Sequence, residues 1–395
     1  MSFRRIADAP SNKTALVRVD FNVPMADGAV SDDTRLRAAL PTIQALTAKG
    51  CKVALLAHFD RPKGKRVPGM SLQPLAAPLS ALLGAPVAFA DDCIGEPAAS
   101  AIAALAPGGV VLLENTRFHA GEEKNDPDLV KALAQLGDFY VNDAFSAAHR
   151  AHASTEGLAH ALPAYAGKAM EAELDALDAA LGNPRRPVLG IVGGSKVSTK
   201  IDLLKNLVTK LDKLAIGGAM ANTFLHAQGW EVGASYCEKD LADTAREIMR
   251  LAGKHKCELL LPIDTIVAEK LDARAPAFVR GLGDIDDDER ILDAGPETIA
   301  RLTKAMDESN TLIWNGPLGV FETPPFDHGT VAAARHAAAR AKNGKLIAVA
   351  GGGDTVAALN HAGVGGDMTF VSTAGGAFLE WMEGKPLPGV EALRG

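Results

Sequence analysis

Charged and polar side chains follow the short apolar segments in the first half of this chain. These side chains are Asp20, Asn22, His58, Arg61, Arg117 and Arg150. In open α/β sheets, ligands bind beyond the carboxyl ends of the strands. Guanidinium groups bind carboxylates and phosphates, while a carboxylate and an amide accept hydrogen bonds from a hydroxyl. The first half therefore predicts a site for a small polyanion.

A further cation, Arg35, stands at the start of an expected helix. It follows Ser31–Thr34, a plausible capping segment, and precedes an apolar helical pattern. An arginine there can bind a ligand above the strand ends, and the positive end of the helix dipole adds to the attraction. We therefore expect Arg35 in the same anion site.

Glycines follow the apolar segments of the second half. The glycine-rich segments are Gly193–Lys200, Gly217–Gly218, Asn315–Gly319, Gly351–Thr355 and Ser372–Gly376. Glycine lets the backbone approach a ligand closely, and exposed N–H groups bind phosphates. Lys196 and Lys200 would lie on one face of a helix starting nearby. Asp354, beside such a loop, suits Mg²⁺. The second half predicts a nucleotide site.

Two common nucleotide motifs are missing from the sequence. The segment Gly193–Lys200 lacks the glycine spacing of a Walker A loop, and Val follows its first lysine. No G-x-G-x-x-G occurs in the chain, which argues against an NAD-dependent dehydrogenase. Nicotinamide binding would revive that alternative.

Composition limits the remaining classes of function. The chain has 395 residues, a net charge of −7, and four cysteines without a C-x-x-C pair. The net charge argues against nucleic acid as a partner. The cysteines predict reduced thiols in the cytoplasm and not a metal site. The chain shows no signal peptide and no segment suited to a membrane span. Zinc at His149 and His152, or calcium at the acidic run 283–289, remain minor alternatives.

Apolar runs of strand length alternate with segments of helical period. The expected strands are 14–20, 52–58, 110–113, 139–142, 188–192, 213–216, 258–261, 311–314, 345–350 and 368–371. The expected helices are 34–49, 72–83, 128–135, 199–209, 241–254, 296–306 and 327–342. Continuous apolar strands indicate parallel sheets that are buried on both faces. We predict an α/β fold with two lobes, each a doubly wound, mostly parallel sheet flanked by helices.

A boundary between the lobes is expected near the middle of the chain. The segment Glu171–Leu181 has the pattern of an amphipathic helix, and Gly182–Pro187 breaks it. Residues 1–170 would form the first lobe, 171–187 the interdomain helix and linker, and 188–377 the second lobe. A long surface helix within one domain is the alternative.

The ordered set of motifs closely resembles the phosphoglycerate kinase family and covers essentially the whole chain. The motifs are Arg-Val-Asp-Phe-Asn-Val-Pro (18–24), Arg-Leu-Arg-Ala-Ala-Leu-Pro-Thr-Ile (35–43), Glu-Asn-Thr-Arg-Phe (114–118), Val-Asn-Asp-Ala-Phe (141–145), His-Arg-Ala-His-Ala-Ser (149–154), Gly-Gly-Ser-Lys-Val (193–197), Trp-Asn-Gly-Pro-Leu-Gly-Val-Phe-Glu (314–322), Gly-Gly-Gly-Asp-Thr (351–355) and Ser-Thr-Ala-Gly-Gly-Ala (372–377).

The resemblance implies reversible phosphoryl transfer between 1,3-bisphosphoglycerate and ADP, giving 3-phosphoglycerate and Mg-ATP. It implies that the triose is held by Asp20, Asn22, Arg35, His58, Arg61, Arg117 and Arg150. It implies that the nucleotide is held by Gly194, Lys196, Lys200, Asn315, Gly316, Glu322, Gly351, Gly352, Gly353, Asp354 and Thr355. Asp354 would bind Mg²⁺, and Glu322 the ribose. A monomer is implied, with residues 378–395 packing back on the first lobe.

Three segments depart from the family pattern. Ser-His-Leu-Gly-Arg-Pro of the family is Ala57-His-Phe-Asp-Arg-Pro62 here, Gly-Thr-Ala-His is Ser146-Ala-Ala-His149, and the first of three glycines after Ser-Thr is Ala374. None of these changes removes a charged ligand. They put substrate affinity in question, above all at Asp60, and not the activity.

Our mechanistic hypothesis assigns three residues to the transferred group. Phosphoryl transfer needs in-line positioning and charge neutralisation. Arg35 and Lys196 would neutralise the charge, helped by the helix N-terminus near Gly375, and closure of the lobes would exclude water. A pseudoenzyme that binds nucleotide without turnover is the alternative, and a coupled ATP assay separates the two.

Overall fold

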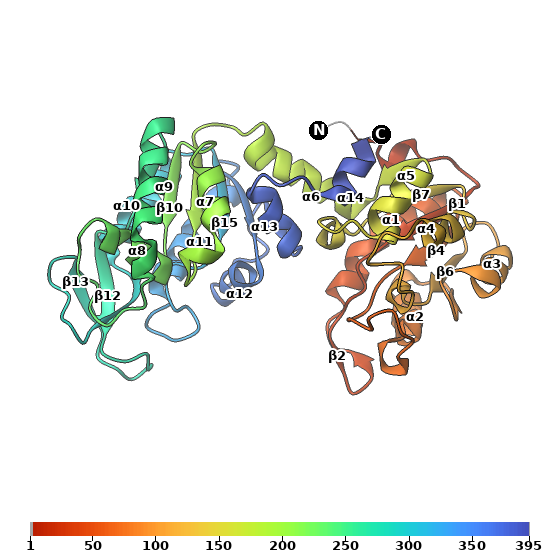
Figure 1. Ribbon diagram of the computed structural model, residues 1–395, viewed down its shortest axis with the longest axis horizontal. Coiled ribbons are helices and arrows are strands. Elements are labelled where there is room, and N and C mark those ends of the chain that lie inside the picture. Colours follow the sequence, from red (N-terminus) through yellow and green to blue (C-terminus); the bar gives the residue numbers. More distant parts are fainter. Residues whose placement is uncertain (1–2, 395) are drawn as a thin grey trace. The chain divides into compact units, whose positions relative to one another are not determined.

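A computed structural model of the chain describes residues 3–394 and divides them into two units (Figure 1). Unit 1 runs to Asp175 and also contains the residues from Pro386 onward. Unit 2 comprises Ala176–Lys385. Each unit is built on a six-stranded parallel sheet. The predicted α/β class is confirmed.

The sheet of unit 1 has the order β5-β6-β4-β1-β7-β8. The strands are β1 (Thr14–Arg18), β4 (Lys52–Leu56), β5 (Val87–Ala90), β6 (Val110–Leu113), β7 (Phe139–Asn142) and β8 (Ala164–Ala166). The helices are α1 (Thr34–Ala48), α2 (Ala76–Leu83), α3 (Gly95–Ala103), α4 (Pro127–Ala134), α5 (Leu158–Ala161) and α14 (Pro388–Glu391). A small hairpin, β2 (Met25–Ala26) and β3 (Ala29–Val30), precedes α1.

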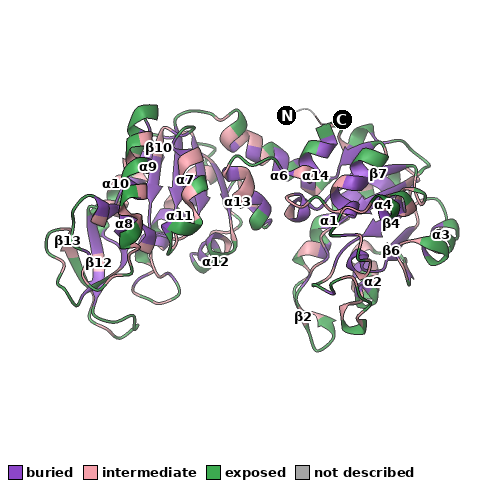
Figure 2. Cartoon of the chain, viewed as in Figure 1, coloured by how far each residue is buried: buried purple, intermediate pink, exposed green. Residues whose placement is uncertain are grey.

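The strands of unit 1 are apolar because helices cover both faces of the sheet. Every residue of β6 and β7 is buried, as Figure 2 shows for the strands of this unit. One core joins Leu36 and Ile43 of α1 to Val17, Val53 and the rest of that sheet face. The strand ends are therefore held in a rigid frame.

The sheet of unit 2 has the order β11-β10-β9-β15-β16-β17. The strands are β9 (Val188–Val192), β10 (Lys213–Ile216), β11 (Glu258–Leu260), β15 (Thr311–Asn315), β16 (Ile347–Gly351) and β17 (Phe370–Ser372). The helices are α7 (Ile201–Leu207), α8 (Ala219–Ala227), α9 (Ala242–His255), α10 (Pro296–Asp307), α11 (His328–Lys342), α12 (Gly353–His361) and α13 (Gly376–Met382).

Unit 2 carries a second sheet that the sequence did not predict. Its antiparallel order is β13-β12-β14, with β12 (Asp264–Ala268), β13 (Phe278–Gly281) and β14 (Arg290–Ala294). All ten expected strands exist, and most bounds agree within two residues. The short strands β5 and β8 were also missed, because runs of three or four residues rich in alanine carry little strand signal.

The helix α6 (Lys168–Leu177) crosses the division between the units and continues as a wider turn through Asp178–Gly182. The structural division differs from the expected bounds at the C-terminal end. Residues 378–385, expected against the first lobe, belong to unit 2 because α13 packs on α7. Only the residues from Pro386 onward lie with unit 1, where Gly389 N donates to Ala148 O. Within residues 3–394, no helix is long and apolar enough to cross a membrane.

Candidate functional site

The carboxyl ends of β1, β4, β6 and β7 bring the predicted triose residues of unit 1 to one edge of the sheet. Asp20, just beyond β1, accepts hydrogen bonds from two other side chains at this edge. Its Oδ1 accepts from Arg35 Nη1 at 3.0 Å, and its Oδ2 accepts from Ser146 Oγ at 2.6 Å. Arg35 Nη1 also donates to Asn22 O at 2.9 Å. Ser146, one of the departures from the family pattern, thus holds the carboxylate of Asp20 in place.

Asp60 occupies the position where the family pattern has glycine. Its φ of 53° lies in the left-handed region, which explains why glycine suits this position. Its backbone joins two predicted site residues, because Asp60 N donates to Asn22 Oδ1 at 2.9 Å and its carbonyl accepts from Arg117 Nη1 at 2.8 Å. Asp60 itself is exposed. The substitution keeps the loop and adds a carboxylate next to the cationic site.

Arg18 is a site residue that the sequence reasoning did not select. It is fully buried at the end of β1, where Nε donates to Ser154 Oγ at 2.8 Å and Nη2 lies 2.8 Å from His58 Nδ1. Glu122 accepts from both Ser154 N and Ser154 Oγ. From the sequence, an arginine within a strand is expected to lie at the solvent-exposed edge of a sheet. Only the fold shows that Arg18 is buried beside Ser154 and His58.

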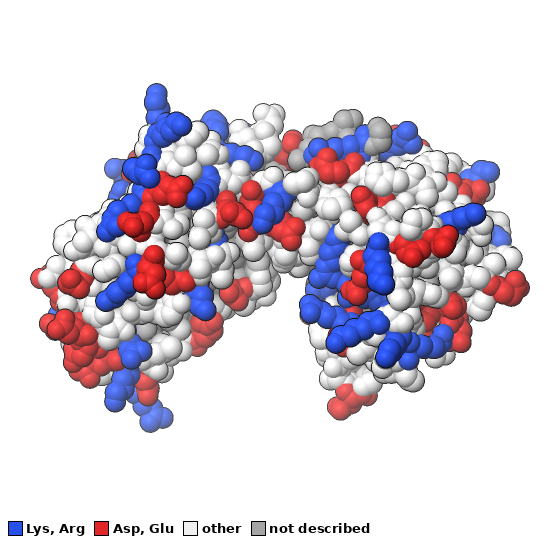
Figure 3. Space-filling view, viewed as in Figure 1, with Lys and Arg blue, Asp and Glu red and all other residues white. Residues whose placement is uncertain are grey.

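Positive charge accumulates at this edge of unit 1. Burial and then the charge of Arg150 lower the pKa of Arg117. Burial, followed by Arg117, Arg18 and Arg150, lowers the pKa of His152 to about 4. Figure 3 shows Lys and Arg side chains gathered on one part of this unit, although the chain has a net charge of −7. The cations repel one another, so an anion placed among them would be strongly favoured.

Two predicted triose residues differ in how firmly they are held. Arg150 is half-buried, and its Nε lies 3.2 Å from His149 Nε2. Arg61 is exposed, and among residues 3–394 its side chain makes no hydrogen bond or ion pair. Arg61 is therefore free to turn towards a ligand.

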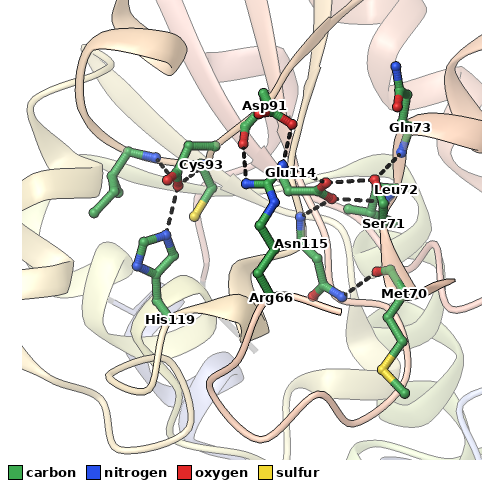
Figure 4. A network of polar contacts seen from close by, with 12 residues as sticks. Arg66, Met70, Ser71, Leu72, Gln73, Asp91, Cys93, Glu114, Asn115 and His119 are labelled. Carbon is green, nitrogen blue, oxygen red and sulfur yellow. Dashed lines mark hydrogen bonds and ion pairs between the residues drawn. The ribbon is translucent and has the colours of Figure 1, made fainter. Parts of the chain in front are cut away.

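Buried polar contacts shape the loop that carries Arg117 (Figure 4). Glu114 accepts from Ser71 Oγ and from Leu72 N, and Asn115 Nδ2 donates to Met70 O at 2.9 Å. Asn115 Oδ1 in turn accepts from Arg117 N at 3.1 Å. Glu114 and Asn115 thus fix the backbone of the loop from which the Arg117 side chain extends.

In unit 2 the candidate nucleotide loops meet where the strand order reverses. Numbered along the chain, the strands lie in the order 3-2-1-4-5-6, so the reversal falls between β9 and β15. Such a switch point is where open α/β sheets bind ligands. A Cβ on Gly193 would lie 1.8 Å from Pro317 O, and one on Gly316 would lie 2.3 Å from Gly193 O. Glycine is required here because the two loops touch through their backbones.

Lys200 and Thr355 tie these loops together. Lys200 Nζ donates to Gly193 O and to Asn315 Oδ1, both at 2.7 Å. Burial lowers the pKa of Lys200 to about 8, with Asp354 acting in the opposite direction. Thr355 Oγ1 accepts from Gly316 N at 2.7 Å and donates to Gly351 O at 2.8 Å. Asn315 Nδ2 also donates to Gly351 O, so all three loops are linked.

We expected Lys196 and Lys200 to share one face of a helix, and this prediction was wrong. The α-helix begins only at Ile201, after a tight turn at Val197–Thr199. Lys196 is exposed, whereas Lys200 is partly buried and points back at the glycine loops. The two cations therefore have different surroundings.

A cavity of ≈ 270 Å³ opens beside these loops. It is lined by the predicted residues Gly194, Glu322 and Asp354, together with residues that the sequence did not single out. Those not singled out include Pro262, Ile291 and Leu292, whereas Gly218, Leu318 and Val320 belong to the segments described above. Apolar walls of this kind suit a flat aromatic base. Their side chains are ordinary core types, so no sequence signal distinguishes them.

The remaining predicted residues surround helix N-termini in unit 2. Gly352, with φ 99°, caps α12, whose first turn contains Gly353 and the exposed Asp354. Gly375, with φ 52°, caps α13. A carboxylate beside backbone N–H groups and Lys200 fits a Mg²⁺ ion that shares phosphate oxygens.

A family model described as phosphoglycerate kinase matches residues 6–385. The chain belongs to the phosphoglycerate kinase family. A phosphoglycerate kinase from Caulobacter vibrioides (strain NA1000 / CB15N) is 70% identical over 394 residues, covering 100% of both chains. Another from Methylobacterium radiotolerans is 62% identical over 395 residues, covering 100% of this chain and 99% of the relative.

Solved structures of the phosphoglycerate kinase family agree with the fold. The phosphoglycerate kinase from Coxiella burnetii matches with a TM-score of 0.94 and 43% identity, covering 99% of each chain. That from Pyrococcus horikoshii OT3 matches with a TM-score of 0.80 and 31% identity, covering 100% of this chain and 98% of that one. The chain is therefore a phosphotransferase with a carboxyl group as acceptor.

Proposed function

We propose that unit 1 binds the triose and unit 2 the nucleotide in the reaction of this family. The chain catalyses reversible phosphoryl transfer between 1,3-bisphosphoglycerate and ADP, giving 3-phosphoglycerate and ATP in glycolysis. The observation that carries the assignment of unit 1 is its concentration of guanidinium groups: after burial, the charges of Arg117, Arg18 and Arg150 lower the pKa of His152. An anionic substrate relieves that repulsion.

In unit 1, cationic side chains and hydrogen-bond acceptors would bind different groups of the triose. Arg117, Arg150 and the exposed Arg61 would bind the phosphate, because guanidinium groups pair well with phosphate oxygens. Asp20 and Asn22 would accept from the hydroxyl. Arg35 and His58 would face the carboxylate that is phosphorylated. Arg35 is anchored through only one nitrogen to Asp20 and Asn22, which supports a role at the reacting group.

In unit 2, the cavity beside the glycine loops would take the nucleotide. The base would lie against Leu292 and Leu318, and Glu322 would accept from the ribose. The N–H groups of Gly351–Thr355 at the start of α12 and the ammonium of Lys200 would bind phosphates. When bound through Asp354, Mg²⁺ would neutralise phosphate charge and orient the nucleotide.

The protein contributes position and charge to the transfer and forms no covalent intermediate. Arg35, Lys196 and the N–H groups beside Gly375 would stabilise the charge on the moving phosphoryl group. Closure of the two units on their substrates would exclude water from the acyl phosphate. A monomeric state and a cytoplasmic location complete the proposal.

A coupled assay with 3-phosphoglycerate and Mg-ATP tests the function directly. We expect turnover that depends on both substrates and on Mg²⁺, with no phosphoenzyme trapped by rapid acid quench. Nucleotide binding without turnover would instead identify a pseudoenzyme.

A further inference from the structure

Asp92, Cys93 and His119 bring three different metal-ligating groups together, outside the proposed substrate site. Their ligand atoms all lie within 4.8 Å of one another. Within residues 3–394, this is the only such group of three or more His, Cys, Asp or Glu side chains. Asp92 and Cys93 follow β5, and His119 ends the loop that carries Arg117. Figure 4 shows the His119 ring beside the Cys93 sulfur.

The backbone already fixes the three side chains. Asp92 Oδ1 accepts from Cys93 N at 2.6 Å and from Ile94 N at 3.3 Å. It also lies 2.7 Å from His119 Nε2. In the described part of the chain no hydrogen bond involves Cys93 Sγ or Asp92 Oδ2. Hydrogen bonds thus orient the Asp92 carboxylate and the His119 ring. Cys93 Sγ and Asp92 Oδ2 are available beside them as further ligand atoms.

The dimensions of the cluster are close to those of a tetrahedral site. Ordinary zinc–sulfur, zinc–nitrogen and zinc–oxygen bonds put the ligand atoms about 3.3–3.6 Å apart. The Asp92–His119 pair would open by less than about 1 Å to reach that spacing. Cys93 is only 1% exposed, but the Asp92 and His119 side chains are 35% and 28% exposed. A cation can therefore arrive from solvent and reach the thiol from that side.

The local charge also favours a cation. Burial raises the pKa of the Cys93 thiol, and the charges of Asp92, Glu122 and Glu114 raise it further. The same negative field attracts a divalent ion, which can displace the thiol proton.

We propose that Asp92, Cys93 and His119 form a binding site for a thiophilic divalent cation such as Zn²⁺ or Co²⁺. Water completes the tetrahedron. Binding forms one bond each to sulfur, to His119 Nε2 and to a carboxylate oxygen. The thiol proton leaves to solvent, and the Nε2 proton is replaced by one on Nδ1, so one proton is released per metal. The separated cysteines of the sequence gave no sign of this site, because His119 comes from a distant loop.

A metal here would act on the loop that carries Arg117. His119 N donates to Thr116 O, and Glu122 N donates to His119 O at 3.1 Å. Glu123, next in sequence, lies 3.5 Å from Arg117 Nε. Fixing His119 would therefore restrict the segment that supplies a proposed triose ligand.

Titration of the whole protein with Co²⁺, followed by absorption spectroscopy, tests the site. We expect one equivalent to bind with a thiolate-to-cobalt charge-transfer band, tetrahedral visible bands and release of one proton. Affinity should rise with pH, because binding releases a proton. Zn²⁺ should displace the cobalt and abolish the bands.

Cys93→Ser should lose the charge-transfer band, whereas Cys237→Ser, which alters a more exposed thiol in unit 2, should keep it. His119→Gln changes a partly exposed side chain and provides the test if Cys93→Ser does not fold; it should lose more than about 100-fold in affinity. The absence of a charge-transfer band in the unmodified protein, or an unchanged band in Cys93→Ser or His119→Gln, would overturn the proposal.

Discussion

The guanidinium of Arg18 lies 2.8 Å from Nδ1 of His58, and both side chains are buried. Arginine can only donate, so Nδ1 must accept and the ring proton must reside on Nε2. Burial first, and then the charges of Arg18, Arg117 and Arg150, hold the pKa of His58 well below its ordinary value. His58 is thus a neutral donor with a defined tautomer.

We predict that His58 stays neutral between about pH 6 and 8, since its ordinary pKa near 6.5 is shifted downward. Protonation is disfavoured by burial and by neighbouring cations, so triose affinity should show no inflection from this group in that range. Nitrogen NMR of selectively labelled histidine should report the Nε2–H tautomer. Arg18→Met should allow the other tautomer to appear; an imidazolium signal for His58 at pH 7 would refute the assignment.

Arg35→Ala should lower kcat by about 10³ with a smaller change in KM, because the arginine acts on charge that develops during transfer. Steady-state kinetics with varied 3-phosphoglycerate measures both constants. Arg37→Ala is the matched control: Arg37 lies in the same turn of α1 but pairs with Asp33 in solvent. Near-full turnover of Arg35→Ala would remove Arg35 from the catalytic role.

Asp60→Gly should lower KM for 3-phosphoglycerate by about two- to fivefold, because it removes an exposed carboxylate next to the cationic site. Asp27 also has a left-handed φ, of 51°, in the turn between β2 and β3. Asp27→Gly therefore relieves the same backbone constraint without changing the substrate site. An unchanged KM in Asp60→Gly, or an equal fall in Asp27→Gly, would mean that the carboxylate of Asp60 does not set the affinity.

Lys200 should make nucleotide affinity depend on pH. Burial lowers its pKa to about 8, so the free protein loses this charge as the pH rises through that value. Bound phosphates favour the ammonium form and raise its pKa, so binding takes up a proton and ADP affinity falls above about pH 8. Calorimetry at pH 8.5 in buffers of different ionisation enthalpy should detect that proton. Lys200→Met should abolish the uptake, whereas Lys205→Met, which alters a lysine paired with Glu247, should retain it; unchanged uptake in Lys200→Met would assign the proton elsewhere.

Much of the fold was predictable because buried parallel strands leave a strong signature. Runs such as Val188–Val192 are apolar throughout, and all five residues are buried. The glycines at Gly193 and Gly316 were also informative, because a side chain there would collide with backbone atoms. In these cases one local requirement permits few residue types.

Other features depend on tertiary contacts that leave no local mark. Arg18 looks like any strand residue until Ser154 and His58 are brought beside it. Leu292 looks like an ordinary core residue until the cavity of unit 2 forms. The helix expected from residue 199 starts instead at Ile201, because a tight turn precedes it and Lys200 bonds to Gly193 O and Asn315 Oδ1.

The central claim is that each unit binds its own substrate, and hydrogen exchange measured by mass spectrometry tests it most directly. With 3-phosphoglycerate alone, we predict slower exchange in the segments around His58–Arg61, Arg117 and Arg150. With Mg-ADP alone, slower exchange should occur around Gly193–Lys200, Asn315–Glu322 and Gly351–Thr355. Protection of the same unit by both ligands would contradict the account.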